Sequence, residues 1–135
     1  PVRRLPVLLL HSREDLAAWR RQQPGPVHFV PTMGALHGGH RQLIILAAQP
    51  LAGAAPAVLV SIFVNPLQFG PGEDFQAYPR ELSADAALAA AAGATALFSP
   101  SVAEIYPRGD TGLTKILPPQ FLSEGLCGRH RPQHF

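Results

Sequence analysis

Two histidines in a glycine-rich segment are the residues of this sequence with the clearest capacity for chemistry. They are His37 and His40, and the segment reads Pro31-Thr32-Met33-Gly34-Ala35-Leu36-His37-Gly38-Gly39-His40. Glycines let a backbone approach a phosphate closely, and the start of a helix supplies free N–H groups and the positive end of a dipole. Imidazole N–H groups can also stabilise charge on transferring phosphate oxygens. The segment therefore predicts a binding site for the phosphates of a nucleotide.

Two other interpretations of this histidine pair stay open. Histidines three residues apart can bind a metal ion, but no third ligand is obvious nearby, so we predict no metal site. The two residues could also be ordinary histidines at the start of a helix, without a chemical role.

A second polar segment follows the apolar run at 57–64 and reads Asn65-Pro66-Leu67-Gln68-Phe69-Gly70-Pro71-Gly72-Glu73-Asp74. The amides of Asn65 and Gln68 both donate and accept hydrogen bonds, which suits the hydroxyl and carboxylate oxygens of a polar substrate. The alternative is a plain Asn-Pro turn with an exposed glutamine. A third segment, 129–135, is rich in arginine and histidine, and it either contacts phosphate or carboxylate groups or forms a solvated tail.

Strands and helices alternate in the pattern that must position these segments. We expect strands at 5–10, 27–30 (stopped by Pro31), 57–64 and 94–98, and a further one near 113–117. We expect helices from an N-cap at Ser12, over 39–49, and from an N-cap at Ser83 to Gly93. This order predicts an α/β fold, a Rossmann-like open parallel sheet with helices on both faces. Ligands of such sheets bind beyond the carboxyl ends of the strands, where both polar segments begin.

Composition excludes several other classes of protein. With 135 residues, 47% hydrophobic and 15% charged, the chain is one folded domain at most. A net charge of +2 is too small to indicate a nucleic-acid partner. No apolar run approaches the roughly 20 residues that span a bilayer, so no membrane partner is expected. The one cysteine, Cys127, cannot form an internal disulfide, which fits a cytoplasmic protein.

Five ordered blocks over residues 27–135 resemble the pantothenate synthetase (pantoate–β-alanine ligase) family. The first is the segment from Pro31 to His40, an extended form of the His-x-Gly-His element of nucleotidyltransferases. The others are Ser61 to Phe69 with Glu73-Asp74, Ala77-Tyr78-Pro79-Arg80, Ile105-Tyr106-Pro107, and Arg131-Pro132-Gln133-His134-Phe135. His-x-Gly-His alone is weakly specific, whereas the five blocks in order are strongly so.

The resemblance implies an ATP-dependent ligase that activates pantoate as pantoyl-adenylate and then transfers the pantoyl group to β-alanine. It implies ATP as a substrate, with Mg²⁺ carried on it, and a homodimer. His40 and His37 would be catalytic. The residues expected to bind ATP are Pro31, Thr32, Met33, Gly34, His37, Gly39 and His40. Those expected to bind pantoate and β-alanine are Gln68, Asn65, Tyr78 and Met33.

The sequence also departs from that family. Family chains are about twice as long, and their second half carries a Lys-Asp-x-Gln-Gln block and a smaller lid domain. We therefore expect residues 1–135 to be a truncated nucleotide-binding domain without the lid, and inactive alone. Some members bind a metal through an acidic cluster, of which only Asp85 is present here, so no metal ligand is assigned. The alternatives are another His-x-Gly-His nucleotidyltransferase or a nucleotide-binding module without catalysis.

Overall fold

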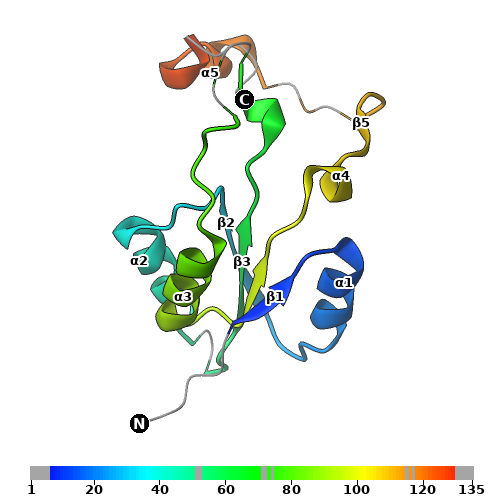
Figure 1. Cartoon of the computed structure of the whole chain (residues 1–135). Helices are drawn as coiled ribbons and strands as arrows, with labels where there is room; N and C mark the ends of the chain where they lie inside the picture. Colours follow the sequence, from blue (N-terminus) through cyan, green and yellow to red (C-terminus); the bar gives the residue numbers. More distant parts are fainter. Residues whose placement is uncertain are drawn as a thin grey trace.

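Within the residues that the structure describes, four parallel strands form one sheet in the order β1-β4-β3-β2 (Figure 1). We obtained a computed structural model that describes residues 7–50, 53–70, 73, 75–114, 116 and 118–129. The strands are β1 (Leu8–Leu10), β2 (Val27–Thr32), β3 (Ala57–Ile62) and β4 (Ala96–Phe98). Helix α1 (Arg13–Arg21) lies on one face of the sheet, and α2 (Gly38–Ala47) and α3 (Leu82–Ala92) lie together on the other. The predicted open parallel sheet with helices on both faces is confirmed.

Strand β3 explains why a continuous apolar run forms a central strand. Val58 and Val60 are fully buried on the face covered by α2 and α3, where they join Ile44 and Leu97. Leu59, between them, faces the other side and packs in a cluster with Trp19 of α1. Because successive side chains of a strand point to opposite faces, a strand buried on both faces has no polar alternation.

Two helix ends agree with the signals in the sequence and one does not. Ser12 caps α1 in a capping box, with Ser12 Oγ accepting from the N–H of Asp15 at 3.0 Å. Gly93 ends α3 in the left-handed region with φ 110°, which favours glycine. However, α3 begins at Leu82 after Glu81, which makes no side-chain cap, so the predicted N-cap at Ser83 is wrong.

Two strand predictions also need correction. Strand β2 continues through Pro31 to Thr32 because it lies at the edge of the sheet. There the N–H that proline lacks would face away from the neighbouring strand, so no hydrogen bond between strands is lost. The predicted strand near 113–117 is absent from the described residues 113, 114 and 116. A short strand, β5 (Pro107–Asp110), lies just before it, after α4 (Val102–Ile105). The first strand begins at residue 8 and not at residue 5, residue 7 lies before it, and residues 5 and 6 of that prediction lie outside the described part.

The remaining elements are short and follow the strands. They are the 3-10 turns η1 (Pro66–Gln68) and η2 (Leu126–Arg129) and the helix α5 (Gln120–Ser123). In the described parts of the chain, no helix is both long and apolar enough to cross a membrane.

Candidate functional site

The turn between β2 and α2 is held by side-chain hydrogen bonds at the end of β2. Thr32 Oγ1 donates to the carbonyl of Ser61 at 2.7 Å and accepts from the N–H of Gly34 at 3.1 Å. Gly34 and Ala35 then adopt positive φ angles of 87° and 51°. This sharp reversal brings the chain from the sheet to the start of α2.

The two histidines cap α2 with their own side chains. His37 is the N-cap residue, and its Nδ1 accepts from the N–H of Gly39 at 3.1 Å. His40 Nδ1 lies 3.4 Å from the N–H of His37, and the two ring centroids are 4.2 Å apart. Because each Nδ1 accepts a hydrogen bond, each neutral ring carries its proton on Nε2. Both imidazoles can therefore donate a hydrogen bond through Nε2. The N–H of Gly39, by contrast, already donates to His37 Nδ1.

Burial lowers the pKa of His40 below its usual value of 6.5. The charge of His37 lowers it further, and the charge of Asp85 opposes the shift. His40 is therefore a neutral imidazole at neutral pH, which preserves the Nδ1 acceptor used by His37.

The lowered pKa of His40 predicts that folding stability falls as the pH drops below 6.5. Between 6.5 and the lower folded-state pKa, the unfolded chain binds more protons at this residue, so acid favours unfolding. Above 6.5 both states are neutral at this position and its contribution is constant. Urea unfolding at about pH 7.5 and about pH 5.5 measures the effect, since wild type should lose more stability than His40→Asn. Equal losses in the two proteins would contradict the prediction.

One open cavity gathers most of the predicted site residues, including members of both polar segments. It has a volume of about 470 Å³ and lies beyond the carboxyl ends of β2 and β3. Its lining residues are Pro31, Thr32, Met33, Gly34, His40, Ser61, Phe63, Asn65, Gln68 and Tyr78. His37 and Gly39 are the two predicted residues outside this lining, while Ser61 and Phe63 belong to it and were not predicted as site residues.

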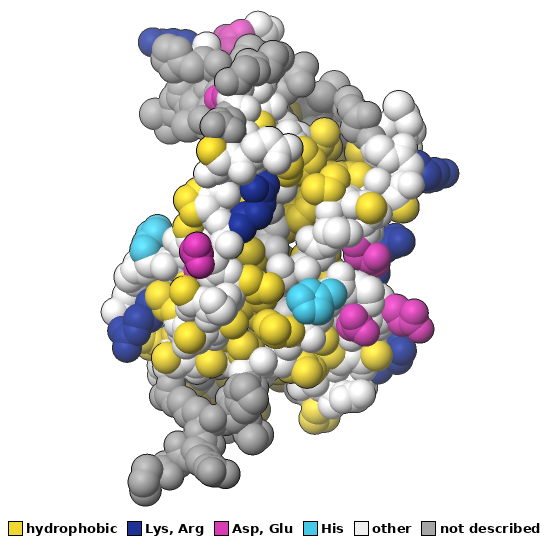
Figure 2. Space-filling model, in the orientation of Figure 1, with side chains coloured by type: hydrophobic (Ala, Val, Ile, Leu, Met, Phe, Trp, Pro, Cys, Tyr) yellow, Lys and Arg dark blue, Asp and Glu magenta, His cyan; other side chains and the backbone are white. Residues whose placement is uncertain are grey.

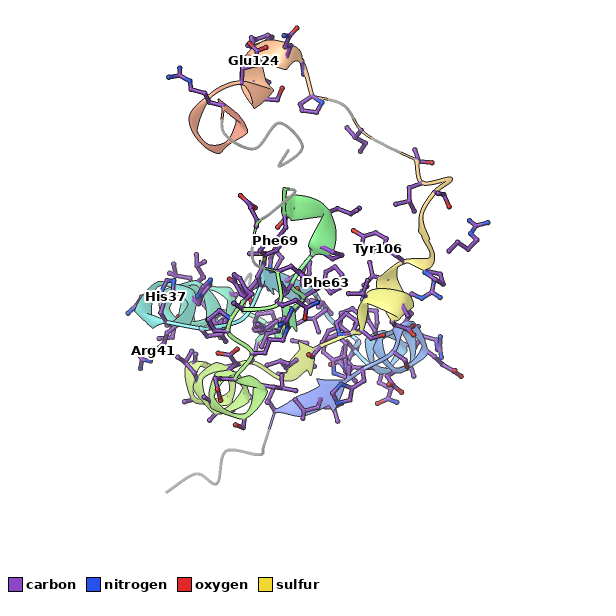
Figure 3. All side chains as sticks on the ribbon, turned by 45° about the horizontal axis from the view of Figure 1, so that its top comes forward. His37, Arg41, Phe63, Phe69, Tyr106 and Glu124 are labelled. Atoms are coloured by element: carbon purple, nitrogen blue, oxygen red, sulfur yellow. The ribbon has the colours of Figure 1, made fainter. Side chains whose placement is uncertain are left out.

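Asn65 is held in a defined orientation by two donors. Its Oδ1 accepts from the N–H of Leu67 at 3.1 Å and from the hydroxyl of Tyr106 at 3.0 Å. The Tyr106 ring also packs near Phe63, with centroids 6.1 Å apart, and Figure 3 shows these two rings close together at the end of β3. With its oxygen engaged, the amide has its NH₂ group left to donate to an acceptor on a ligand.

A second, mainly apolar cavity of about 430 Å³ adjoins the first and shares Met33 and Phe63 with it. Its other lining residues include Phe75, Arg80, Asp85 and Ser99. In Figure 2 apolar side chains gather in a hollow on this face of the molecule. The guanidinium of Arg80 donates to the carbonyls of the loop before it and lies over the ring of Phe75 at 5.0 Å.

Asp85 and Tyr106 are residues near the site whose contacts the sequence did not reveal. Asp85 lies on α3. It is only 4% exposed, and its carboxylate accepts from the N–H groups of Ala35 and Leu36. A lone carboxylate within an alanine-rich helix is the signal that could have indicated such a buried role.

Other predicted features can be placed only in part. Among the described residues, no three His, Cys, Asp or Glu side chains gather in a group able to hold a metal ion. In the arginine- and histidine-rich segment, Arg129 is exposed, and residues 130–135 lie outside the described part of the chain.

Comparison with known proteins identifies the same family throughout. The sequence model of the pantoate-beta-alanine ligase family matches residues 9–135. Pantothenate synthetase from Pseudomonas fluorescens is 51% identical over 134 residues, which cover 99% of this chain and 43% of that protein. The bifunctional pantoate ligase/cytidylate kinase of Thermosynechococcus vestitus is 60% identical over 109 residues, covering 81% of this chain and 20% of that protein.

Solved structures show the same relationship at the level of the fold. Pantothenate synthetase from Thermus thermophilus has a TM-score of 0.79 and 42% identity, covering 96% of this chain and 44% of that one. Pantoate-beta-alanine ligase from Francisella tularensis, complexed with beta-gamma ATP and beta-alanine, has a TM-score of 0.79 and 38% identity, covering 95% of this chain and 48% of that one. The chain therefore spans less than half the length of these relatives.

Proposed function

Because the chain belongs to the pantoate–β-alanine ligase family, we propose that it forms the part of such a ligase that binds ATP and pantoate. In this reaction a carboxylate oxygen of pantoate attacks the α-phosphorus of ATP, and pyrophosphate leaves. The amine of β-alanine then attacks the activated carbonyl, and AMP leaves. The observation that carries the proposal is the cavity that joins His40 to the amides of Asn65 and Gln68.

The histidines supply donors for the phosphate side of this reaction. With Nδ1 engaged by the backbone N–H of His37, Nε2–H is the donor that His40 has left for a phosphate in the cavity that it lines. Negative charge grows on the phosphate oxygens as the P–O bond to pyrophosphate breaks, and a donor fixed in advance stabilises that charge. His37 contributes by capping α2 and by packing its ring against His40.

The side-chain amides of Asn65 and Gln68 supply hydrogen-bonding groups for pantoate. The NH₂ group of Asn65 is oriented by Tyr106 and suits a carboxylate or hydroxyl oxygen of the acid. Gln68 and Tyr78 line the same cavity within reach of a small polar substrate. Mg²⁺ would enter with ATP, because this ion is commonly held by substrate phosphates and water with few protein ligands. It would neutralise phosphate charge there.

The direct test is formation of pyrophosphate and pantoyl-adenylate by the complete gene product supplied with ATP, Mg²⁺ and pantoate. Pantothenate and AMP should appear only when β-alanine is added. A screen of other carboxylic acids and of CTP tests the alternative of a different nucleotidyltransferase, which would prefer another acceptor or nucleotide. ATP binding with no pyrophosphate release from any acid would indicate a nucleotide-binding module instead.

Gln68→Ala is expected to raise the KM for pantoate, and that for β-alanine, more than the KM for ATP. The loss of hydrogen bonds to a polar acid weakens its binding by about 1 kcal/mol or more, a factor of roughly five to ten. Steady-state kinetics with each substrate varied in turn provide the measurement. Gln76→Ala is the matched control, because Gln76 is exposed and belongs to neither cavity lining. A variant of Gln68 that mainly weakened ATP would assign this residue to the nucleotide instead.

The homodimer and the cytoplasmic location are also part of the proposal. Support for a dimer comes from the family resemblance and from exposed apolar side chains such as Leu43 and Leu46 on α2. Sedimentation of the complete gene product tests the dimer, and fractionation of the source cells tests the location.

A further inference from the structure

A buried carboxylate on α3 reaches across to the loop that precedes the two histidines. Asp85 Oδ2 accepts from the N–H of Ala35 at 3.0 Å, and Oδ1 accepts from the N–H of Leu36 at 2.7 Å. A carboxylate that is 4% exposed is costly unless charge-assisted hydrogen bonds compensate for lost water. Here both of its oxygens are committed to one loop, about 50 residues away in the sequence.

The loop has a backbone shape that requires such support. Gly34 and Ala35 both have positive φ, and Ala35 carries a side chain in a region that such residues seldom occupy. A residue in that conformation persists when its surroundings hold it there. The loop also packs tightly against its support, since a Cβ at Gly34 would lie 2.9 Å from Ile62 Cγ2 and 3.1 Å from Asp85 Oδ2.

The contact acts on the histidines through one short step of the chain. Leu36 directly precedes His37, whose N–H contacts His40 Nδ1 and whose ring caps α2. A shift of Leu36 would move the N-cap and with it both imidazoles. The carboxylate itself would repel a phosphate, so it contributes by holding the loop and not by touching ATP.

We propose that Asp85 is a positioning residue for the ligase reaction, holding the loop at Gly34–Leu36 so that His37 and His40 are placed for the phosphates of ATP. The inference rests on the proposed function for its kinetic consequence, whereas the contact between α3 and the loop can be tested separately. Because this role concerns geometry, replacing Asp85 should change the rate of the reaction while the protein still folds.

Asp85→Asn in the complete gene product tests the kinetic consequence. Asparagine keeps one acceptor, but its NH₂ group faces a backbone N–H, so the loop must shift. A displacement of about 1 Å in a reacting geometry costs up to about 100-fold, and we expect kcat for pantoyl-adenylate formation to fall by about 10- to 100-fold. The KM for pantoate should change by less than about threefold, because the amides on the other wall are unaffected. Ser83→Ala, an exposed position on the same helix, should retain wild-type kcat.

Nuclear magnetic resonance of the same proteins separates positioning from a merely structural role. In Asp85→Asn the amide signals of Ala35 and Leu36 should move and exchange faster with solvent, and the ring ¹⁵N signals of His37 and His40 should show a mixture of tautomers. Signals of the buried strand residues Val58 and Val60 should stay in place. A purely structural contribution would instead lower the melting temperature and leave the kcat of the folded enzyme unchanged.

The outcomes are distinct. Wild-type kcat in Asp85→Asn, or unchanged histidine ring signals, would overturn the proposal. If the wild-type protein forms no pantoyl-adenylate, the proposed function is wrong. The ring ¹⁵N signals of His37 and His40 would still show whether Asp85 positions the two histidines. If Asp85→Asn does not fold, Gly34→Ala disturbs the same contact from the loop side. It should lower kcat similarly, and a wild-type kcat in that variant would overturn the proposal.

Discussion

Replacing His40 by alanine is expected to lower kcat for pantoyl-adenylate formation by about 10²–10³, with a much smaller change in the KM for pantoate. Removing a fixed donor from developing negative charge costs roughly 3–4 kcal/mol of barrier. The imidazole lines the cavity beside Thr32 and Met33, and its Nε2–H is left as the donor once Nδ1 accepts from His37. Single-turnover measurement of pyrophosphate release gives the rate of this step directly.

Two further variants make the test specific. His11→Ala removes an exposed histidine that belongs to neither cavity lining and should leave kcat unchanged. His37→Asn keeps a good N-cap side chain but loses the imidazole, so any fall in kcat reports the ring and not the cap. If His40→Ala mainly raised the KM for pantoate, the histidine would belong to the acid site and the proposed roles of the two segments would exchange.

Leu97→Ala is expected to destabilise the chain by about 2–5 kcal/mol, the range for truncating a buried leucine and leaving a cavity. Leu97 is fully buried in β4 and belongs to the cluster that joins the sheet to α2 and α3. Both helices contribute to the site, since α2 carries the histidines and α3 carries Asp85. Urea unfolding followed by circular dichroism measures the loss.

Leu122→Ala provides the matched comparison, because the same side chain is 62% exposed on α5. Its stability should stay within about 0.5 kcal/mol of wild type. Similar losses in both variants would mean that Leu97 does not lie in the buried core.

The order of elements followed from local sequence. The run at 57–64 is apolar at nearly every position, and a strand of that kind has to lie inside a sheet with both faces covered. Two helix ends were recognisable because their signals act within one turn of the helix. The side chains of Ser12 and Asp15 cap the start of α1, and Gly93, which has no side chain, adopts the positive φ that ends α3. Where the local signal was weak the prediction was wrong, as for the cap at Ser83 and the strand near 113–117.

Strand ends depended on neighbours that local sequence does not show. Pro31 indicated the end of a strand by its missing N–H, yet β2 continues through it because the edge of the sheet requires no bond on that side. The position of β2 at the edge is a property of the whole topology.

The sequence by itself indicated the candidate side chains for the chemistry, because histidines among glycines and amides after an apolar strand are recognisable by residue type and spacing. It could not show that Asp85 holds the loop at Ala35 and Leu36, or that Tyr106 orients the amide of Asn65. These contacts join residues 41 to 50 positions apart. Only the packing of α3 and α4 beside the ends of the parallel strands brings them together, since hydrogen bonds act over about 3 Å and chain separation carries no information about that distance.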